Sequence, residues 1–273
     1  MTTINRHGLS SDIPDPIKRT IRQECGFGCA YCGKAIVEYH HFDPPFVEAC
    51  EHRPDGIILL CPNCHTKFGD VPVKYMRQYR QAPRCKKVGF TRDEFLFGFD
   101  QIPKIKVGKI TATSGQIIRH SSRVLLGLTE SEEEGPLCLT CELFDARNTL
   151  MLRILNNELT IGVDHFDVEL ETKRLRIRRK RGDIVLQMKT NRVDEVCISH
   201  LEMVIAGGTI RCTPHQGCIL TPPSGGSCSI SGDIKGDVGV WFNDDDHCLI
   251  AAGWSGGCGI DLRWVAEAKN VMG

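Results

Sequence analysis

Four cysteines and three histidines in the first quarter of the chain have the types and spacing needed to bind metal ions. The cysteines form two C-x2-C pairs, within residues 29–32 and 61–64. Two such pairs supply four thiolates, the usual ligand set of a closed, tetrahedral zinc site that stabilises a fold. His40 and His41 lie between the pairs and His65 follows the second pair, so three histidines remain available for a second role. The predicted zinc ligands are Cys29, Cys32, Cys61 and Cys64.

Short elements are expected to hold these residues in place. Residues 35–41 have β propensity and run into Asp43-Pro44-Pro45, and residues 56–60 form an aliphatic run typical of a second strand. Pro62 favours the start of a helix that carries the last cysteine and histidine. The predicted order is strand, loop, strand, helix, preceded by a basic helix over residues 17–24. Regular strand geometry points the two adjacent histidines to opposite faces, so they share a site only if the strand end is distorted or they act from different sides.

The joint pattern of these motifs resembles a known family. It comprises CGFGCAYCG at residues 25–33, EYHH at 38–41 and DGIILLCPNCH at 55–65. A lone C-x2-C is a weak signal, but two pairs that enclose His-His and close with Cys-His are specific. The pattern is similar to the HNH endonucleases, in the branch whose ββα-metal finger is braced by a four-cysteine zinc site. The resemblance covers roughly residues 13–70, a quarter of the chain.

The resemblance implies a metal-dependent endonuclease that hydrolyses phosphodiester bonds in DNA. It assigns His41 as the general base, and His40 and His65 as ligands of a catalytic Mg²⁺ or another divalent ion such as Mn²⁺ or Ni²⁺. A divalent ion polarises the phosphate and stabilises the leaving oxygen. A neutral histidine whose pKa is close to the ambient pH can take a proton from water.

One position departs from the family pattern. The central asparagine of the family is expected five residues before Cys61, where this chain has Gly56. That asparagine pins the loop that orients the general base, so its absence reduces preorganisation. His52 or Asp55 can fill the orienting or ligand role instead. The alternatives are a surface-loop histidine and a turn residue before the glycine.

A basic segment over residues 71–92 follows the metal motifs. Pro72 is expected to open a helix that continues to about Gln81, where Ala82-Pro83 closes it. Residues 1–92 contain 14 lysines and arginines against nine acidic residues, although the whole chain has zero formal net charge. The segment is either a phosphate-contacting surface or a solvated helix face. The candidate nucleic-acid contacts are Lys67, Lys74, Arg77, Arg80, Arg84, Lys86 and Lys87.

The remainder of the chain has the pattern of short β strands separated by turns. Together with the helices expected before it, this predicts an α+β protein with two domains. The predicted divisions are an HNH domain at 1–70, a basic helical connector at 71–92 and an all-β domain at 93–273. A two-sheet sandwich is favoured over a β-solenoid because no repeat of fixed period is convincing. Helical periodicity returns only at 266–271. The predicted strands are 104–110, 116–119, 124–128, 137–144, 150–155, 166–170, 175–178, 184–189, 196–198, 209–212, 228–230, 238–242 and 248–252.

The 273 residues include 15 cysteines, and whether they form disulfide bonds depends on the redox state of the compartment in which the protein resides. No apolar stretch approaches the length of a membrane span, and the first residues lack the apolar region of a signal peptide. We therefore expect a cytoplasmic protein without a disulfide framework and without a membrane partner. Cysteines outside the zinc site, Cys25 and Cys50 among them, are expected to be packing residues.

Two further features of the β region have alternative interpretations. The C-x2-C pair at 138–141 could form a second zinc site with Cys212, His215 and Cys218. Its alternating pattern instead favours buried cysteines of a strand, and we prefer that interpretation. The basic run at 173–181 is predicted to be a hairpin edge whose charges discourage strand pairing, with a nucleic-acid contact as the alternative.

The leading hypothesis is therefore a DNA endonuclease whose β domain controls targeting or activation. By analogy of architecture, such a protein suits bacterial defence against foreign DNA. The alternative is a catalytically decayed zinc-binding module that docks DNA or protein. In a third hypothesis, compatible with the first, the β domain reads modified bases or senses a regulatory ligand or partner protein. Self-association into a homo-oligomer is also plausible, because many strand edges are available.

Overall fold

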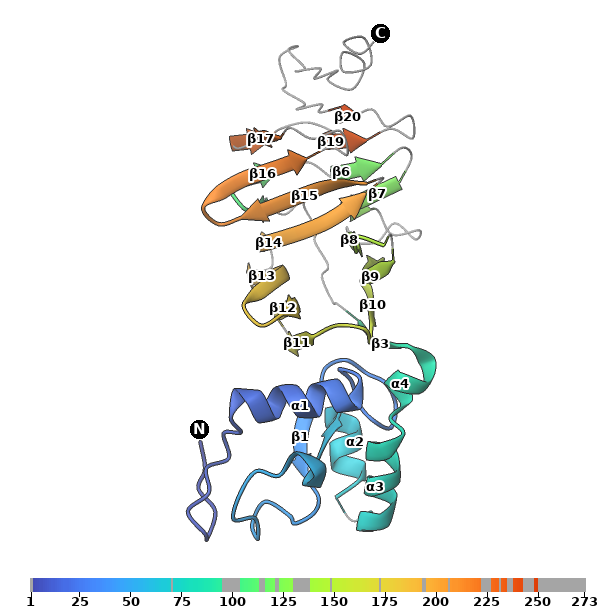
Figure 1. Ribbon diagram of the computed structural model, residues 1–273, viewed down its shortest axis with the longest axis vertical. Helices are drawn as coiled ribbons and strands as arrows, with labels where there is room; N and C mark the ends of the chain where they lie inside the picture. The colour runs from blue at the N-terminus through green and yellow to red at the C-terminus, as the bar shows by residue number, and fades with distance from the viewer. Residues whose placement is uncertain are drawn as a thin grey trace. The chain divides into compact units, whose positions relative to one another are not determined.

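The computed structural model shows an α+β protein with mostly β content, few helices and open sheets (Figure 1). The chain divides into two compact units. Unit 1 comprises Met1–Asp93, Thr160–Thr172 and Ile177–Asp183, and unit 2 comprises Glu94–Leu159, Lys173–Arg176 and Ile184–Gly273. The structure describes residues 2–69, 71–94, 104–112, 116–120, 123–129, 138–147, 149–171, 173–192, 195–205, 207–221, 227–230, 232–234, 238–242 and 248–249.

The elements of unit 1 follow the order predicted from the sequence. The expected helix at 17–24 is confirmed as α1, which ends at Gly26 with φ 71°, a left-handed cap that glycine adopts readily. The predicted strand, loop, strand, helix series is confirmed as β1, β2 and α2, and the helix after Pro72 is confirmed as α3. The elements are α1 Asp15–Cys25, β1 Glu38–His41, a 3-10 turn Pro54–Gly56, β2 Ile57–Leu60, α2 Pro62–Lys67, α3 Val73–Gln81, α4 Arg84–Val88 and β3 Phe90–Glu94.

Strand β2 is the centre of the hydrophobic core of unit 1. It pairs antiparallel with β1, from Glu38 opposite Leu60 to His41 opposite Ile57. Every side chain of β2 is buried, which explains an unbroken aliphatic run where a half-exposed strand would alternate. Ile21 of α1 and Met76 of α3 pack into the same core. The two-stranded sheet is thus covered well enough to hold its loop and helix in a defined register.

A buried ion pair ties α1 to a distant part of the chain within unit 1. The Asp167 side chain is 0% exposed and accepts hydrogen bonds from Arg22 Nε (2.8 Å), Arg22 Nη2 (2.9 Å) and Arg178 Nη1 (2.8 Å). Burial by itself lowers the pKa of Arg22, but the hydrogen bond and charge of Asp167 outweigh it and raise that pKa above its ordinary value. Unit 1 therefore includes β11 and the tip of the β12–β13 hairpin, which lie far from residues 1–93 in sequence.

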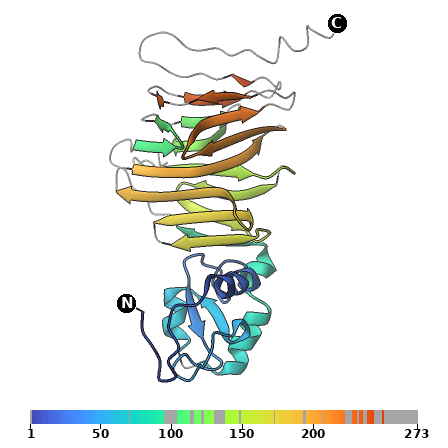
Figure 2. The same cartoon turned by 60° about the vertical axis from the view of Figure 1, so that its left-hand side comes forward.

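Unit 2 is built from β strands that run side by side in two open sheets (Figure 2). One sheet has the order β20-β19-β6-β7-β8-β9 and the other the order β13-β14-β15-β16-β17, and β14 of one lies in contact with β8 of the other. Strand β4 pairs with β14 and β5, and β5 also pairs with β18. The strands within unit 2 are β4 Lys104–Val107, β5 Ile110–Ala112, β6 Gln116–His120, β7 Arg123–Thr129, β8 Cys138–Phe144, β9 Leu150–Leu155, β14 Glu195–Ile205, β15 Gly208–Thr213, β16 Gln216–Thr221, β17 Cys228–Ile230, β18 Gly232–Ile234, β19 Val238–Phe242 and β20 Cys248–Leu249.

Four further strands lie in the part of the chain where the two units alternate in sequence. They are β10 Glu158–Gly162, β11 Asp167–Glu171, β12 Arg174–Lys180 and β13 Asp183–Arg192. Strand β11 belongs wholly to unit 1, whereas unit boundaries fall within the other three. The hairpin predicted for the basic run is confirmed by β12 and β13, which flank a turn at Arg181 and Gly182. The expectation that this run is a sheet edge is wrong, because β12 lies between β11 and β13 in the sheet and is paired on both sides.

Most β runs expected from the sequence are strands, but among the described residues β3, β10, β16 and β18 were missed. The single strand expected at 104–110 is wrong, because a turn at Gly108 and Lys109 divides it into the antiparallel strands β4 and β5. The sequence does contain a signal for β10, the Asn156-Asn157 pair that precedes it, because asparagine is favoured in tight hairpin turns. In the structure these two residues have φ 49° and φ 63°, as such a turn requires. The helix expected at 266–271 lies outside the described residues. None of the helices among the described residues combines the length and apolar character that crossing a lipid bilayer requires.

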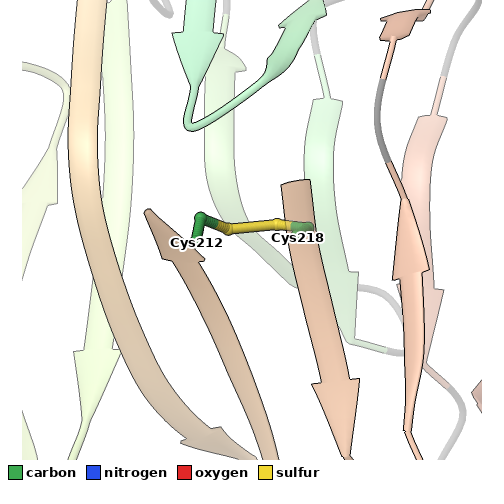
Figure 3. The surroundings of a disulfide bond; sticks show 2 residues. All are labelled: Cys212 and Cys218. Carbon is green, nitrogen blue, oxygen red and sulfur yellow. A yellow bond between two sulfur atoms is a disulfide. The ribbon is translucent and has the colours of Figure 1, made fainter. Parts of the chain in front are cut away.

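Two expectations about cysteines need correction. Cys212 and Cys218 form a disulfide bond between β15 and β16, so the thiols of the chain are not all free as expected (Figure 3). The second zinc site that used these two cysteines is excluded by this bond, and the preferred interpretation of the 138–141 pair as buried cysteines of a strand is confirmed. Cys25 is buried as expected, whereas Cys50 is exposed and is not a packing residue.

We expect Asp167→Asn to destabilise unit 1 by about 3 kcal/mol, because it removes the main counter-charge of the buried Arg22 and leaves only Glu169, whose Oε1 lies 3.4 Å from Arg22 Nη2. All four tyrosines lie in unit 1 and all three tryptophans in unit 2, so tyrosine fluorescence during denaturant unfolding reports on unit 1. The matched control is Asp183→Asn, which removes the more exposed ion pair with Arg179 and should change stability by less than about 1 kcal/mol. An equal decrease in the free energy of unfolding for the two variants would refute a special contribution of Asp167.

Candidate metal centre and histidine cleft

The four cysteines predicted as zinc ligands converge in space. The sulfur atoms of Cys29, Cys32, Cys61 and Cys64 all lie within 4.8 Å of one another, and those of Cys32 and Cys61 are 3.5 Å apart. Zinc–sulfur bonds of about 2.3 Å in a tetrahedron place sulfurs about 3.8 Å apart. The cluster has the donor set and the dimensions to hold a zinc ion. In the part of the chain that the structure describes, it is the one group that gathers three or more such ligand atoms.

Local backbone geometry presents each cysteine pair. In the first pair, Gly33 N donates to Cys29 O (2.9 Å) and Cys32 N approaches Cys29 Sγ (3.5 Å), which closes a tight turn after α1. In the second pair, Cys61 ends β2 and Cys64 lies in the first turn of α2. Burial raises the pKa of Cys32 to about 12, so a thiolate here requires a bound cation. The arrangement is that of a site that metal binding completes.

The three histidines line one cleft of about 680 Å³ in unit 1. The cleft is bounded by β1, by the N-terminal segment with Thr3 and Ser11, and by Phe46 in the loop after β1. His40 and His41 both line it, although they are neighbours in a strand. Their ring contacts differ, since His40 faces His65 and His41 faces His52 and Phe46, which agrees with the expectation that the two rings address the site from different sides. The cleft residues that sequence analysis proposed are His40, His41 and His65.

His40 and His65 face each other, from β1 and α2. Their ring centroids are 4.8 Å apart at an interplanar angle of 75°. Burial, and then the proximity of His65, lower the pKa of His40, which favours the neutral ring that a metal ligand requires. The two rings supply imidazole ligands from opposite walls of the cleft.

Glu38 is a cleft residue that the sequence analysis missed. Its Oε2 lies 2.6 Å from His65 Nδ1, which leaves the other ring nitrogen of His65 free for a ligand. A carboxylate on the second nitrogen of a metal-binding histidine fixes its tautomer and ring orientation. The signal was available: Glu38 precedes His40 by two residues, and side chains two apart in a strand share a face.

His41 is held by contacts different from those of His40. Its Nε2 lies 3.0 Å from His52 Nδ1, and its ring centroid lies 5.4 Å from that of Phe46. Burial, then His52 and His40, lower the pKa of His41 to about 4, so the ring is neutral at neutral pH. Of the two residues considered for an orienting role, His52 contacts His41. Asp55 is exposed, and its Oδ2 accepts a hydrogen bond from Arg53 Nη2 (2.9 Å).

Gly56 occupies a position that no larger residue can take on this backbone. A Cβ atom there would overlap the carbonyl oxygen of Asp43. The Gly56 carbonyl accepts hydrogen bonds from the backbone N–H groups of Phe42 (2.9 Å) and Asp43 (3.2 Å). The loop between β1 and β2 is thus closed by backbone contacts at the position where the family pattern has asparagine.

The seven basic residues proposed as nucleic-acid contacts differ in their surroundings. Arg77 pairs with Asp43. Arg80 is largely buried, pairs with Glu24 and donates to the carbonyl oxygens of Ile57 (2.9 Å) and Pro54 (3.2 Å). Arg77 is exposed despite its ion pair, and the other five exposed side chains are those of Lys67, Lys74, Arg84, Lys86 and Lys87.

We expect the purified chain to contain one tightly bound zinc per molecule, and Cys64→Ser to lose it, because three thiolates bind zinc far more weakly than four. Metal content measured by inductively coupled plasma mass spectrometry checks this. Cys50→Ser is the control, since Cys50 is exposed and lies outside the cluster, and it should retain full zinc content. A zinc-free native chain would refute the metal centre.

Comparisons with known proteins assign this chain to no family. No protein-family model matches it, and no curated protein and no solved structure gives a significant match.

Proposed function

We propose that the protein is a metal-dependent endonuclease that hydrolyses phosphodiester bonds in DNA. In this proposal, β1, β2 and α2 form an HNH-type ββα-metal finger, and a zinc ion bound by the four cysteines braces it. The observation that carries the proposal is that His40, His41 and His65 all line one cleft of unit 1, which also holds the four-sulfur cluster. Two strands and a helix in this order supply all three rings and the second cysteine pair.

The residues present fit a divalent ion bound between His40 and His65. Their rings face each other, burial favours the neutral form of His40, and Glu38 orients His65. Imidazole ligands suit Ni²⁺ as well as zinc, whereas Mn²⁺ and Mg²⁺ prefer oxygen ligands, and Mg²⁺ keeps several waters. When bound, such an ion would polarise the scissile phosphate and stabilise the leaving 3′ oxygen.

His41 is the candidate general base. Its ring lines the same cleft and is neutral at neutral pH, so a ring nitrogen is available to accept a proton from an attacking water, although a pKa of about 4 makes it a weaker base than an ordinary imidazole. Because His41 Nε2 is engaged with His52, the proton would be taken at Nδ1. Asp55, which is exposed and paired with Arg53, contributes no contact to this step in our proposal.

DNA would approach along the exposed basic side chains of unit 1. Lysine and arginine on α3 and α4 can neutralise backbone phosphates, which gives affinity without sequence specificity. Arg77 and Arg80 are already paired, and in this proposal they act mainly by holding the loop between β1 and β2. We take the two open sheets of unit 2 as a sandwich that controls targeting or activation, a plan that would suit defence against foreign DNA.

One observation favours a second candidate function, a zinc-binding docking module without activity. Among the described residues, the cysteines alone gather three or more ligand atoms, and the cleft histidines do not. Gly56 in place of the family asparagine is compatible with such a module. The two functions differ in metal stoichiometry, because a docking module has no need for an ion beyond the zinc.

To test the enzymatic function, supercoiled plasmid is incubated with the full chain and Mg²⁺, Mn²⁺ or Ni²⁺. We expect nicking with at least one ion, and a loss of about 10²- to 10⁴-fold in rate for His41→Ala, the typical contribution of a general base. His215→Ala removes an exposed turn histidine of unit 2 and should leave the rate unchanged. Undiminished cleavage by His41→Ala would remove His41 from its role.

Metal titration separates the two candidate functions. An endonuclease should bind a second divalent ion in calorimetry of the zinc-loaded chain, and His40→Ala should abolish that binding while zinc is retained. No second ion and no cleavage with any of the three metals would favour the docking module.

A further inference from the structure

We propose that His52 is a positioning residue that fixes the tautomer of His41 in which Nε2 carries the proton and Nδ1 is the basic atom. The catalytic purpose of this contact rests on the proposed function. The contact itself does not, because it is defined by the 3.0 Å separation of His41 Nε2 and His52 Nδ1.

The proton between these two nitrogen atoms decides whether His41 can act as a base. A neutral imidazole has one N–H donor and one acceptor nitrogen. If His52 donated to His41 Nε2, then His41 Nδ1 would carry the hydrogen and could not take a proton from water. If His41 Nε2 donates instead, Nδ1 is free to accept, and the resulting imidazolium keeps its hydrogen bond to His52. The geometry of this pair therefore suits a base only with His52 as the acceptor.

The loop that carries His52 is held from two sides. Near Phe46, Asn5 Nδ2 donates to the carbonyl oxygens of Phe46 (2.6 Å) and Ala49 (2.7 Å). Beyond His52, Arg80 Nη2 donates to Pro54 O (3.2 Å). His52 is half-buried between these anchors, so its ring can present a fixed acceptor to His41.

Phe46 completes the placement of the His41 ring. The Phe46 and His52 rings lie 5.4 Å and 5.3 Å from the His41 ring centroid, and both belong to the loop between β1 and β2. This loop is the one that the asparagine of the family pattern would pin. Here the Gly56 carbonyl closes the loop through the backbone, and His52 supplies the side-chain contact to the base.

His41 and His52 could instead be two ligands of one metal ion, and experiment must distinguish this role from positioning. Two nitrogens about 3 Å apart can also be adjacent ligands of one ion with bonds of about 2.1 Å. In that case His52→Ala would lose a bound ion, whereas a positioning residue leaves metal stoichiometry intact.

The first test is nuclear magnetic resonance of the full zinc-loaded chain with ¹⁵N-labelled histidine. We expect a proton on His41 Nε2 and a coupling across the hydrogen bond to His52 Nδ1. In His52→Ala the coupling is lost and His41 is no longer restricted to one tautomer. This readout needs no cleavage activity. A proton on His41 Nδ1, or no coupling in the wild-type chain, would overturn the proposal.

The second test is kinetic. His52→Ala should lower kcat for plasmid nicking by about 10- to 100-fold with little change in KM, as for other residues that orient a reacting group. His52→Asn, which places an amide oxygen near the former Nδ1, should restore most of the rate, whereas His52→Phe should not. Arg53→Ala changes the exposed neighbour and should leave kcat unchanged.

The outcomes separate this proposal from the proposed function. A wild-type chain that cuts no DNA with any of the three ions would overturn the endonuclease and the catalytic purpose of His52 together. An active wild-type chain in which His52→Ala is equally active, or loses a bound ion, would overturn the positioning role of His52 alone.

Discussion

The arrangement of unit 1 depends on bringing four sulfur atoms within reach of one cation. Burial raises the pKa of Cys32 and of Cys64, which disfavours their thiolates in the absence of a cation, and a bound zinc ion would favour them, so folding and metal binding would be coupled. The cluster joins the turn after α1 to the junction of β2 and α2. Because α2 carries His65 and β2 pairs with the strand that carries His40 and His41, the same constraint orients the histidine cleft.

Within that frame, two of the three cleft histidines have a polar partner of their own. His65 contacts Glu38 and His41 contacts His52, while His40 faces His65. Partners of this kind fix tautomers and ring orientations, which a metal ligand and a base both require. The cleft therefore contains two differently tuned imidazole groups side by side. This asymmetry is what an ion-assisted hydrolysis needs, and it supports the function we propose.

Much of unit 1 could be predicted because its signals are local. C-x2-C spacing predicts a metal knuckle, Pro62 predicts a helix start, and the aliphatic run before Cys61 predicts a buried strand. Glu38 could have been found from strand periodicity alone. The disulfide between Cys212 and Cys218 could not, because expectations of compartment argued against any such bond. Paired arginines such as Arg77 and Arg80 were likewise indistinguishable in sequence from free ones.

The sequence by itself determined which four cysteines form the candidate zinc site, the order of strand, loop, strand and helix, and the change to β structure after the basic segment. All of these depend on residue type and on spacings of a few residues. The tertiary structure alone decided that Gly56 must lack a side chain, that His52 meets His41, and that Arg22 is neutralised by Asp167, 145 residues away. The physical reason is that overlap, hydrogen bonding and charge pairing act through distances in space, and separation along the chain does not predict those distances.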